Sequence, residues 1–271
     1  MKSDLHNHIY VTWEQGKLSL QRKPRTLEYI ADLAIENGLG ILGITSHGQS
    51  DNRFSKLKET ISTLSKKYEV SDLGSVIEIY DLPRRLIIVN SRTVPTKQGD
   101  VLLIGEDFPF KDNADITNTL KKAKGLGMIT IAEHMFVEEA GGIGQKVFEA
   151  NAEYFDAIEI NGQAPKKYNQ QAIKYATEIG KPLIANSDSH TPKDIASTYT
   201  KYESGFFLIY KSDYEFIEKL NSAIKKPLGI TVKGTPFLRK ASWISILIYD
   251  AFIRRKTGLL PFQETKSRFK I

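Results

Sequence analysis

The chain has 271 residues, of which 41% are hydrophobic and 26% charged, a composition that excludes disordered, collagen-like and low-complexity classes. It contains no cysteine, which excludes disulfide frameworks, thiolate catalysis, cysteine–zinc modules and iron–sulfur clusters. The net charge of +6 comes from residues 221–271, which carry +9, so the other 220 residues are mildly acidic at −3.

Short apolar runs alternate with helical patterns from the N-terminus to about residue 232. The predicted strands are 4–9, 41–45, 86–90, 101–104, 128–132, 157–160, 182–186, 206–209 and 228–232. The predicted helices are 26–37, 54–67, 115–126, 145–152, 166–179 and 214–225. Residues 68–85 interrupt this alternation and are expected to form an excursion from the barrel. This alternation predicts parallel crossovers and a parallel sheet, either open or closed into a barrel.

The C-terminal segment differs from the rest by its charge. We expect two parts, a barrel domain at 1–234 and a basic extension at 235–271 with one apolar helix at 241–255. A basic tail suits an anionic partner such as nucleic acid or a membrane surface, although its Lys and Arg could simply keep it soluble. A helix that is apolar on most sides usually packs into protein; a membrane-interface helix or a dimer contact is the alternative.

No segment resembles a signal peptide or a transmembrane helix. The first ten residues lack an apolar core. The longest apolar stretch, 243–253, is interrupted by Ser245 and Asp250 and is too short to cross a bilayer of about 30 Å. We therefore expect a cytoplasmic protein.

All five histidines fall within or just after a predicted strand: His6, His8, His47, His134 and His190. On a strand, residues two apart project to the same face, so His6 and His8 can approach one cation together. Strand C-terminal ends share one face of an α/β barrel. Imidazole and carboxylate, here Asp188, are preferred ligands of Zn²⁺, Mn²⁺ and Fe²⁺. A single histidine could be structural, but the set predicts a multinuclear metal site.

Five segments, in order, resemble the motifs of the PHP (polymerase and histidinol phosphatase) superfamily of metal-dependent phosphoesterases. They are Asp4-Leu5-His6-Asn7-His8, Ile44-Thr45-Ser46-His47, Ala132-Glu133-His134, Ile158-Glu159-Ile160-Asn161 and Ser187-Asp188-Ser189-His190. The resemblance covers residues 1 to about 232. It implies a distorted (β/α)7 barrel, here followed by the basic extension, that binds one to three divalent ions (Zn, Mn or Fe) at its strand ends.

The resemblance also implies the ligand sets: His6, His8 and Asp188 for the first ion, His134 for the second, and His47, His190 and Glu14 for the third. The expected catalytic residues are Asp188 and His190. Cations at the rim of the site would bind phosphate, and the candidates are Arg92, Lys97 and Arg53. Residues 141–144, Gly-Gly-Ile-Gly, lack the Lys-Ser/Thr of a P-loop and are interpreted as a loop beside the site.

The sequence departs from the family pattern at two positions. Thr93 stands where the family has a glutamate that bridges two ions, and Asp100 stands where it has a histidine. A threonine hydroxyl is a poor ligand, whereas Asp100 could ligate. Either the cluster is reduced to one or two ions, or another carboxylate substitutes. The candidates for that role are Glu106, Glu133 and Glu159.

The leading hypothesis is a metal-dependent phosphoesterase. It would hydrolyse a phosphomonoester, or a nucleotide or nucleic-acid phosphodiester, by attack of metal-activated water. The alternative is a catalytically degenerate barrel that serves as a nucleic-acid or protein binding module, which the loss of the bridging glutamate favours. Amidohydrolase chemistry also uses His-x-His, but the lysine or bridging carboxylate that it needs has no clear candidate.

Overall fold

The structure is a computed structural model that describes residues 1–8, 11–15, 20–24, 26–49, 53–81, 83–207 and 209–233. Only the backbone is described for 11–15, 20–24, Arg53, Thr63 and Phe206. The predicted extension and its apolar helix, 241–255, lie outside the described residues.

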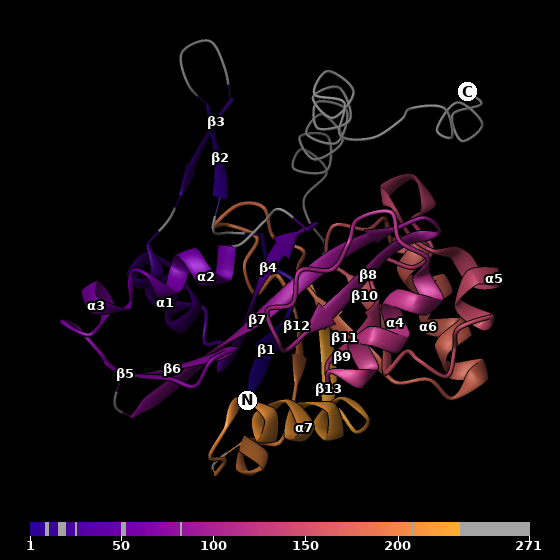
Figure 1. The fold of residues 1–271 in the computed structure, drawn as a ribbon. Helices are drawn as coiled ribbons and strands as arrows, with labels where there is room; N and C mark the ends of the chain where they lie inside the picture. The colour runs from indigo at the N-terminus through magenta and orange to yellow at the C-terminus, as the bar shows by residue number, and fades with distance from the viewer. Residues whose placement is uncertain are drawn as a thin grey trace. The chain divides into compact units, whose positions relative to one another are not determined.

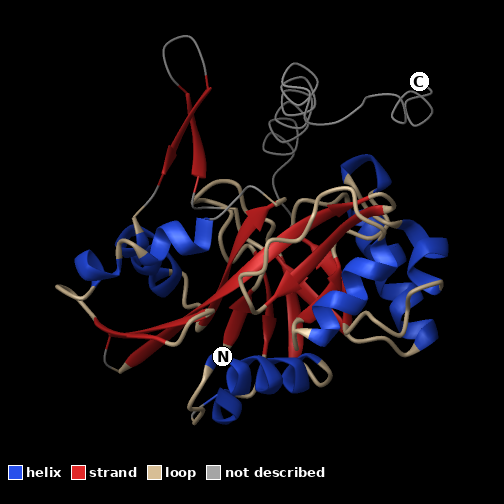
Figure 2. Cartoon of the chain, in the orientation of Figure 1, coloured by secondary structure: helices blue, strands red, loops and turns tan. Residues whose placement is uncertain are grey.

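An eleven-stranded sheet forms the centre of the described chain (Figures 1 and 2). Its main path runs β11-β10-β9-β8-β7-β4-β1-β12-β13. These strands are β1 (Lys2–Asp4), β4 (Ile41–His47), β7 (Arg84–Thr96), β8 (Gly99–Ile104), β9 (Ile129–Ala132), β10 (Ala157–Asn161), β11 (Leu183–Asn186), β12 (Thr198–Lys201) and β13 (Gly229–Val232). The sheet curls into a nearly closed barrel, which confirms the predicted α/β barrel class.

The sheet is mixed rather than parallel, so the prediction of a parallel sheet is wrong in part. β1, β4 and β7 are parallel to one another, as are β9, β10 and β11. β8 is antiparallel to both β7 and β9, and β12 is antiparallel to β1. Only two residues, Lys97 and Gln98, connect β7 to β8, and a parallel crossover needs a dozen or more. The start of β8 therefore lies at the same end of the barrel as the C-terminal ends of its neighbours.

The two sides of the barrel meet where β11 approaches β1 and β12. Thr200 Oγ1 in β12 accepts a hydrogen bond from Ala185 N in β11 at 2.8 Å. Asn186 Oδ1 accepts one from Leu5 N at 2.8 Å. Beyond the strand ends, His8 N donates to Ser189 O at 2.8 Å. These contacts bring the segment that carries His6 and His8 beside the segment that carries Asp188.

Amphipathic helices cover the sheet. They are α1 (Leu27–Glu36), α2 (Arg53–Lys58), α3 (Ile61–Leu64), α4 (Ile116–Gly125), α5 (Gly144–Glu149), α6 (Lys166–Ile179) and α7 (Asp213–Ile224). α1 begins after Thr26, whose side chain accepts from Tyr29 N, and it buries Leu27, Ile30 and Ala34 at helical spacing. In Figure 1, α4, α5 and α6 lie together on one side of the sheet, and α7 crosses the end at which β1 begins.

Other predicted elements differ in detail. The predicted helix 54–67 is two short helices, α2 and α3, and residues 206–207 of the predicted strand 206–209 belong to the 3₁₀ helix η2 (Ser204–Phe207). The excursion at 68–85 is an antiparallel extension of β7 by β5 (Glu69–Asp72) and β6 (Val76–Asp81). β2 (Val11–Gln15) and β3 (Leu20–Pro24) pair as a separate two-stranded sheet. No helix in the described ranges is both long and apolar enough to cross a membrane.

Candidate metal centre

All five histidines gather at one end of the barrel. His6 and His8 follow β1, His47 ends β4, His134 follows β9, and His190 follows β11. The His8 ring centroid lies 5.1 Å from that of His6, 4.7 Å from that of His190 and 6.0 Å from that of His47. The His6 and His134 centroids are 6.1 Å apart. Segments up to 184 residues apart in the chain therefore meet in one cluster.

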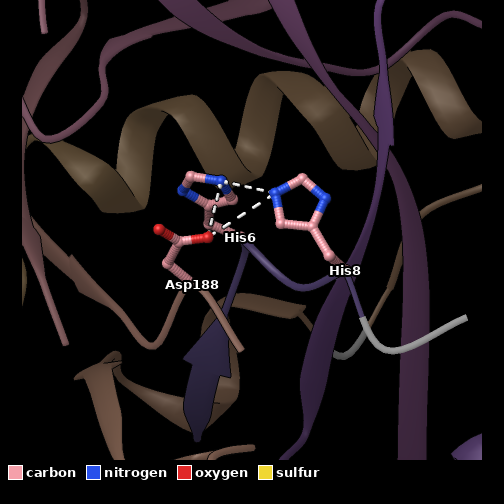
Figure 3. A group of neighbouring side chains, drawn as sticks. All are labelled: His6, His8 and Asp188. Atoms are coloured by element: carbon pink, nitrogen blue, oxygen red, sulfur yellow. Dashed lines mark hydrogen bonds and ion pairs between the residues drawn. The ribbon is translucent and has the colours of Figure 1, made fainter. Parts of the chain in front are cut away.

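The first group of potential ligands consists of His6, His8 and Asp188, all buried. Figure 3 shows the three side chains pointing toward one another. The two Nε2 atoms are 3.1 Å apart, and Asp188 Oδ1 lies 3.4 Å from His6 Nε2 and 3.5 Å from His8 Nε2. Ligands about 2.0–2.1 Å from a tetrahedral ion are separated by about 3.3 Å. The three atoms therefore already have the spacing of a divalent-metal ligand set.

Asp4, at the end of β1, fixes the position of the segment that carries Asp188. Its Oδ1 accepts from Ser187 N at 2.9 Å and its Oδ2 accepts from Ala196 N at 3.0 Å. Complete burial raises the pKa of Asp4 to about 7, although these hydrogen bonds oppose the rise. Asp188 itself has a left-handed backbone, with φ of 51°, a conformation that costs energy in a residue other than glycine. The fixed turn directs its carboxylate toward the two imidazoles.

Glu159, in β10, orients the His6 ring. Its Oε1 lies 2.9 Å from His6 Nδ1 and accepts from Asn186 Nδ2 at 2.9 Å. Its Oε2 accepts from His134 N and from Asn161 Nδ2, each at 3.0 Å. A carboxylate that holds Nδ1–H of a histidine leaves Nε2 available to a metal and increases its basicity. Burial would raise the pKa of Glu159, but the charge and hydrogen bond of His6 outweigh it and lower the pKa to about 2.

The same carboxylates act on the proton affinity of His6. Burial lowers the pKa of this imidazole, but Asp188, Glu159 and Glu133 outweigh that effect and hold the pKa well above its usual value. These three carboxylates therefore stabilise a positive charge at the His6 ring. A metal ion would meet the same electrostatic preference that the proton does.

A second group of potential ligands lies beside the first and consists of Asp100, Glu133 and His134, whose ligand atoms lie within 4.8 Å of one another. Thr93 Oγ1 donates to Glu133 Oε2 at 2.9 Å. Within the described part of the chain, Glu133 Oε1 and His134 Nδ1 are buried and have no hydrogen-bond partner. Burial raises the pKa of Glu133 well above its usual value, and Asp100 and Glu159 add to the rise. Buried polar atoms without partners are costly, so the second group also fits a cation.

The residues expected to hold a third ion are only partly described. His190 Nδ1 lies 2.9 Å from Asp188 O and 3.7 Å from Asp188 Oδ1, and its ring stands against that of His8. His47 is also next to His8. Glu14 lies in β2, and its side chain is outside the described residues. The ligand roles of His47, His190 and Glu14 therefore remain predictions.

The three candidate phosphate-binding cations differ in position. Arg92 is 3% exposed; its Nη1 donates to Gly48 O and its Nη2 to Asp107 Oδ1, each at 2.6 Å. It therefore holds the loop that follows His47. Lys97 is exposed in the turn between β7 and β8. Arg53 begins α2, and its side chain is not described, so the phosphate-binding role of all three stays a prediction.

The glycine-rich loop, residues 141–144, packs directly against the second group. Asp100 N donates to Gly141 O at 2.7 Å. A Cβ atom at Gly141, where φ is 96°, would lie 2.3 Å from Asp100 Oδ2, and one at Gly142 would lie 2.6 Å from His134 O. Only glycine allows this approach. The loop therefore packs against potential metal ligands, which agrees with its interpretation as a loop beside the site.

Sequence reasoning missed the residues that position the histidines: Asp4, Asn161 and Asn186, and the orienting role of Glu159. A signal was present, because all four lie on strands at or near the C-terminal end. In an α/β barrel, the C-terminal strand ends carry the functional site, and this applies to these polar residues as it does to the histidines.

A family model described as PHP-associated matches residues 166–220, which run from α6 into α7. No curated protein matches the sequence. The solved structure of PsfC from Pseudomonas syringae PB-5123 is similar over 94% of this chain and 98% of its own, with a TM-score of 0.60 at 15% identity.

A two-domain protein from Bacteroides vulgatus ATCC 8482, described as containing a predicted PHP-like metal-dependent phosphoesterase, is similar over 86% of this chain. The similarity covers 64% of that protein, with a TM-score of 0.55 at 15% identity. At these identities the two structures show a shared fold. The PHP-associated match is limited to residues 166–220, and the two solved structures are similar in fold over most of this chain.

Proposed function

We propose that the chain is a metal-dependent phosphoesterase that hydrolyses a phosphomonoester or a nucleotide-type phosphodiester. The observation that carries the proposal is the convergence of His6 Nε2, His8 Nε2 and Asp188 Oδ1 at separations of 3.1–3.5 Å in a buried site. The phosphoesterase description of the Bacteroides relative supports the reaction class.

The first group would hold one ion, and the second group offers ligands for another. A divalent ion there would lower the pKa of bound water from 15.7 to about 7 and neutralise charge on an attacked phosphate. Asn161 Nδ2 donates to Asp188 Oδ2 at 3.1 Å. This hydrogen bond fixes the Asp188 carboxylate so that Oδ1 faces the imidazoles. Glu159 fixes His6 in the same way.

His190 is suited to move a proton. Its side chain is 28% exposed, whereas those of His8 and Asp188 are 7% and 5% exposed. Its Nδ1 is held by Asp188 O, which directs Nε2 away from that contact. An imidazole at the solvent side of the cluster can protonate the departing oxygen of a phosphate ester. Arg92, paired with Asp107, holds the loop that follows His47 in place.

Hydrolysis of chromogenic phosphate esters tests the proposal. The full chain would be loaded with Mn²⁺ and supplied with p-nitrophenyl phosphate and bis(p-nitrophenyl) phosphate. We expect turnover that EDTA abolishes and that His8→Ala reduces at least about 100-fold. The exposed substitution Lys174→Ala is the control and should retain full activity.

Two results would contradict the proposal. Turnover that is insensitive to EDTA would place the reaction elsewhere. Bound Mn²⁺ without turnover on either ester would favour the binding module instead. The domain boundary at 234, the cytoplasmic location and a nucleic-acid contact by residues 221–271 stay predictions.

A further inference from the structure

Where β7 runs beside the two groups of potential metal ligands, its residue is Thr93, which has no carboxylate. In the sheet, Thr93 lies opposite His47 of β4 and Leu102 of β8. Its hydroxyl donates to Glu133 Oε2 at 2.9 Å, so Thr93 contacts a carboxylate that comes from the next strand but one. Glu133 itself follows β9 and is completely buried.

Glu133 lies between the two ligand groups. Its Oε2 is 3.3 Å from His6 Nε2, an atom of the first group. The same carboxylate belongs to the second group, with Asp100 and His134. Its Oε1 is buried and has no hydrogen-bond partner among the described residues. One carboxylate oxygen is therefore close to the first group, and the other has no protein partner to stabilise it.

The two other nearby glutamates are not available for such a role. Glu159 uses both oxygens for four hydrogen bonds, two on each oxygen. Glu106 is exposed and follows the C-terminal end of β8, which runs away from the cluster. Glu133 alone among the three combines burial, contact with His6 and an unpaired oxygen.

We propose that Glu133 is the shared carboxylate of a two-ion site. It would join an ion held by His6, His8 and Asp188 to a second ion held by Asp100 and His134. Two-metal sites place their ions about 3.5–4 Å apart, a span that one carboxylate bridges. The hydroxyl of Thr93 is then a positioning group that fixes the bridging oxygen. This inference rests on the metal centre of the proposed function but not on its reaction.

The glycine loop limits the ligands of the second ion. Gly141 and Gly142 pack on Asp100 and on the His134 backbone, and Asp100 N is anchored to Gly141 O. The loop therefore holds Asp100 close to Glu133 and His134. A small side chain at either glycine would displace this aspartate or the turn that carries His134.

Metal content and the electron paramagnetic resonance of bound Mn²⁺ test the proposal without an activity assay. The full chain is titrated with Mn²⁺ as wild type, as Glu133→Gln and as Glu139→Gln. Glu139 is an exposed carboxylate six residues away in the chain and serves as the matched control. We expect at least two ions per chain and an exchange-coupled spectrum for wild type and Glu139→Gln. Glu133→Gln should bind one ion fewer and give only the six-line signal of isolated Mn²⁺.

Thermal unfolding separates metal binding from folding. Burial disfavours the charged form of Glu133, so the metal-free Glu133→Gln variant should be at least as stable as wild type, while its stabilisation by Mn²⁺ should fall. A coupled spectrum that persists in Glu133→Gln would overturn the proposal, as would a wild type that binds a single ion. A wild type that binds no ion at all would overturn the proposed function as well, so the two failures are distinguishable.

Discussion

Glu159 Oε1 lies 2.9 Å from Nδ1 of His6, across 153 residues of chain. Within the described residues, its other hydrogen bonds come from Asn186, Asn161 and the backbone N of His134. Glu159 therefore sets the tautomer of His6 that exposes Nε2 to a metal.

Glu159→Gln tests this role. The substituted side chain keeps its shape but replaces one acceptor oxygen by an NH₂ group that meets donors, and it removes the negative charge beside His6. We expect the affinity for Mn²⁺ to fall about 10–100-fold, measured by isothermal titration calorimetry. Glu178→Gln, on the exposed face of α6, is the control. Unchanged affinity in Glu159→Gln would show that His6 is oriented by other groups.

Thr93→Val removes the hydroxyl that holds Glu133 Oε2 and keeps the side-chain shape. The first ion keeps His6, His8 and Asp188 as ligands, so its affinity should fall less than that of the second ion. The second ion should bind about 10-fold or more weakly. A two-step Mn²⁺ titration measures both affinities. Equal weakening of both ions would contradict the assignment of Thr93 to the bridging carboxylate.

His190→Gln separates a proton donor from a metal ligand. If His190 protonates the leaving oxygen, turnover should fall about 10²–10⁴-fold, and the ion content should stay at the wild-type value. The deficit should shrink with an ester such as p-nitrophenyl phosphate, whose leaving group needs little protonation, and grow with an alkyl ester. A lost ion in His190→Gln would assign the residue to the metal instead.

A separate cluster predicts how stability depends on pH. Glu78 accepts hydrogen bonds from Tyr210, Arg85 and Tyr80, the last at 2.8 Å. Burial raises the pKa of Glu78, but these contacts and the charge of Arg85 outweigh it and lower the pKa. A lowered pKa contributes stability above the unfolded value of about 4.3, and this contribution is lost as the pH falls through the folded value.

Glu78→Gln should therefore destabilise the protein by about 1.5–3 kcal/mol at pH 7. The difference from wild type should shrink when the pH falls below about 4, where the wild-type carboxyl takes up its proton. Urea unfolding at the two pH values measures both, with Glu69→Gln, exposed on β5, as the control. An equal difference at pH 7 and at low pH would mean that the ionised form is not the stabilising one.

The sequence predicted the gathering of the histidines because each lies within or just after a predicted strand. β1 ends at Asp4, so His6 and His8 lie beyond it rather than on the predicted strand 4–9, whereas His134 and His190 follow a buried apolar run as predicted. The barrel class followed from the same alternation of strands and helices. These inferences depend on local patterns of apolar and polar residues, which can be read from a single sequence.

Other features depend on partners that are distant in the chain. The reversed direction of β8 follows from the two-residue turn at Lys97 and Gln98, which the pattern of apolar runs did not register. β12 consists of Thr-Tyr-Thr-Lys, and the buried Thr200 hydroxyl bonds to β11 rather than filling an apolar core. The proposal of Glu133 over Glu106 and Glu159 depends on the burial of each carboxylate and on the hydrogen bonds of Glu133 and Glu159.

Anomalous X-ray scattering from crystals grown with Mn²⁺ would locate the bound ion. We expect a peak enclosed by His6 Nε2, His8 Nε2 and Asp188 Oδ1, which disappears in Asp188→Asn. No peak among these three atoms, with manganese bound elsewhere or not at all, would contradict this expectation.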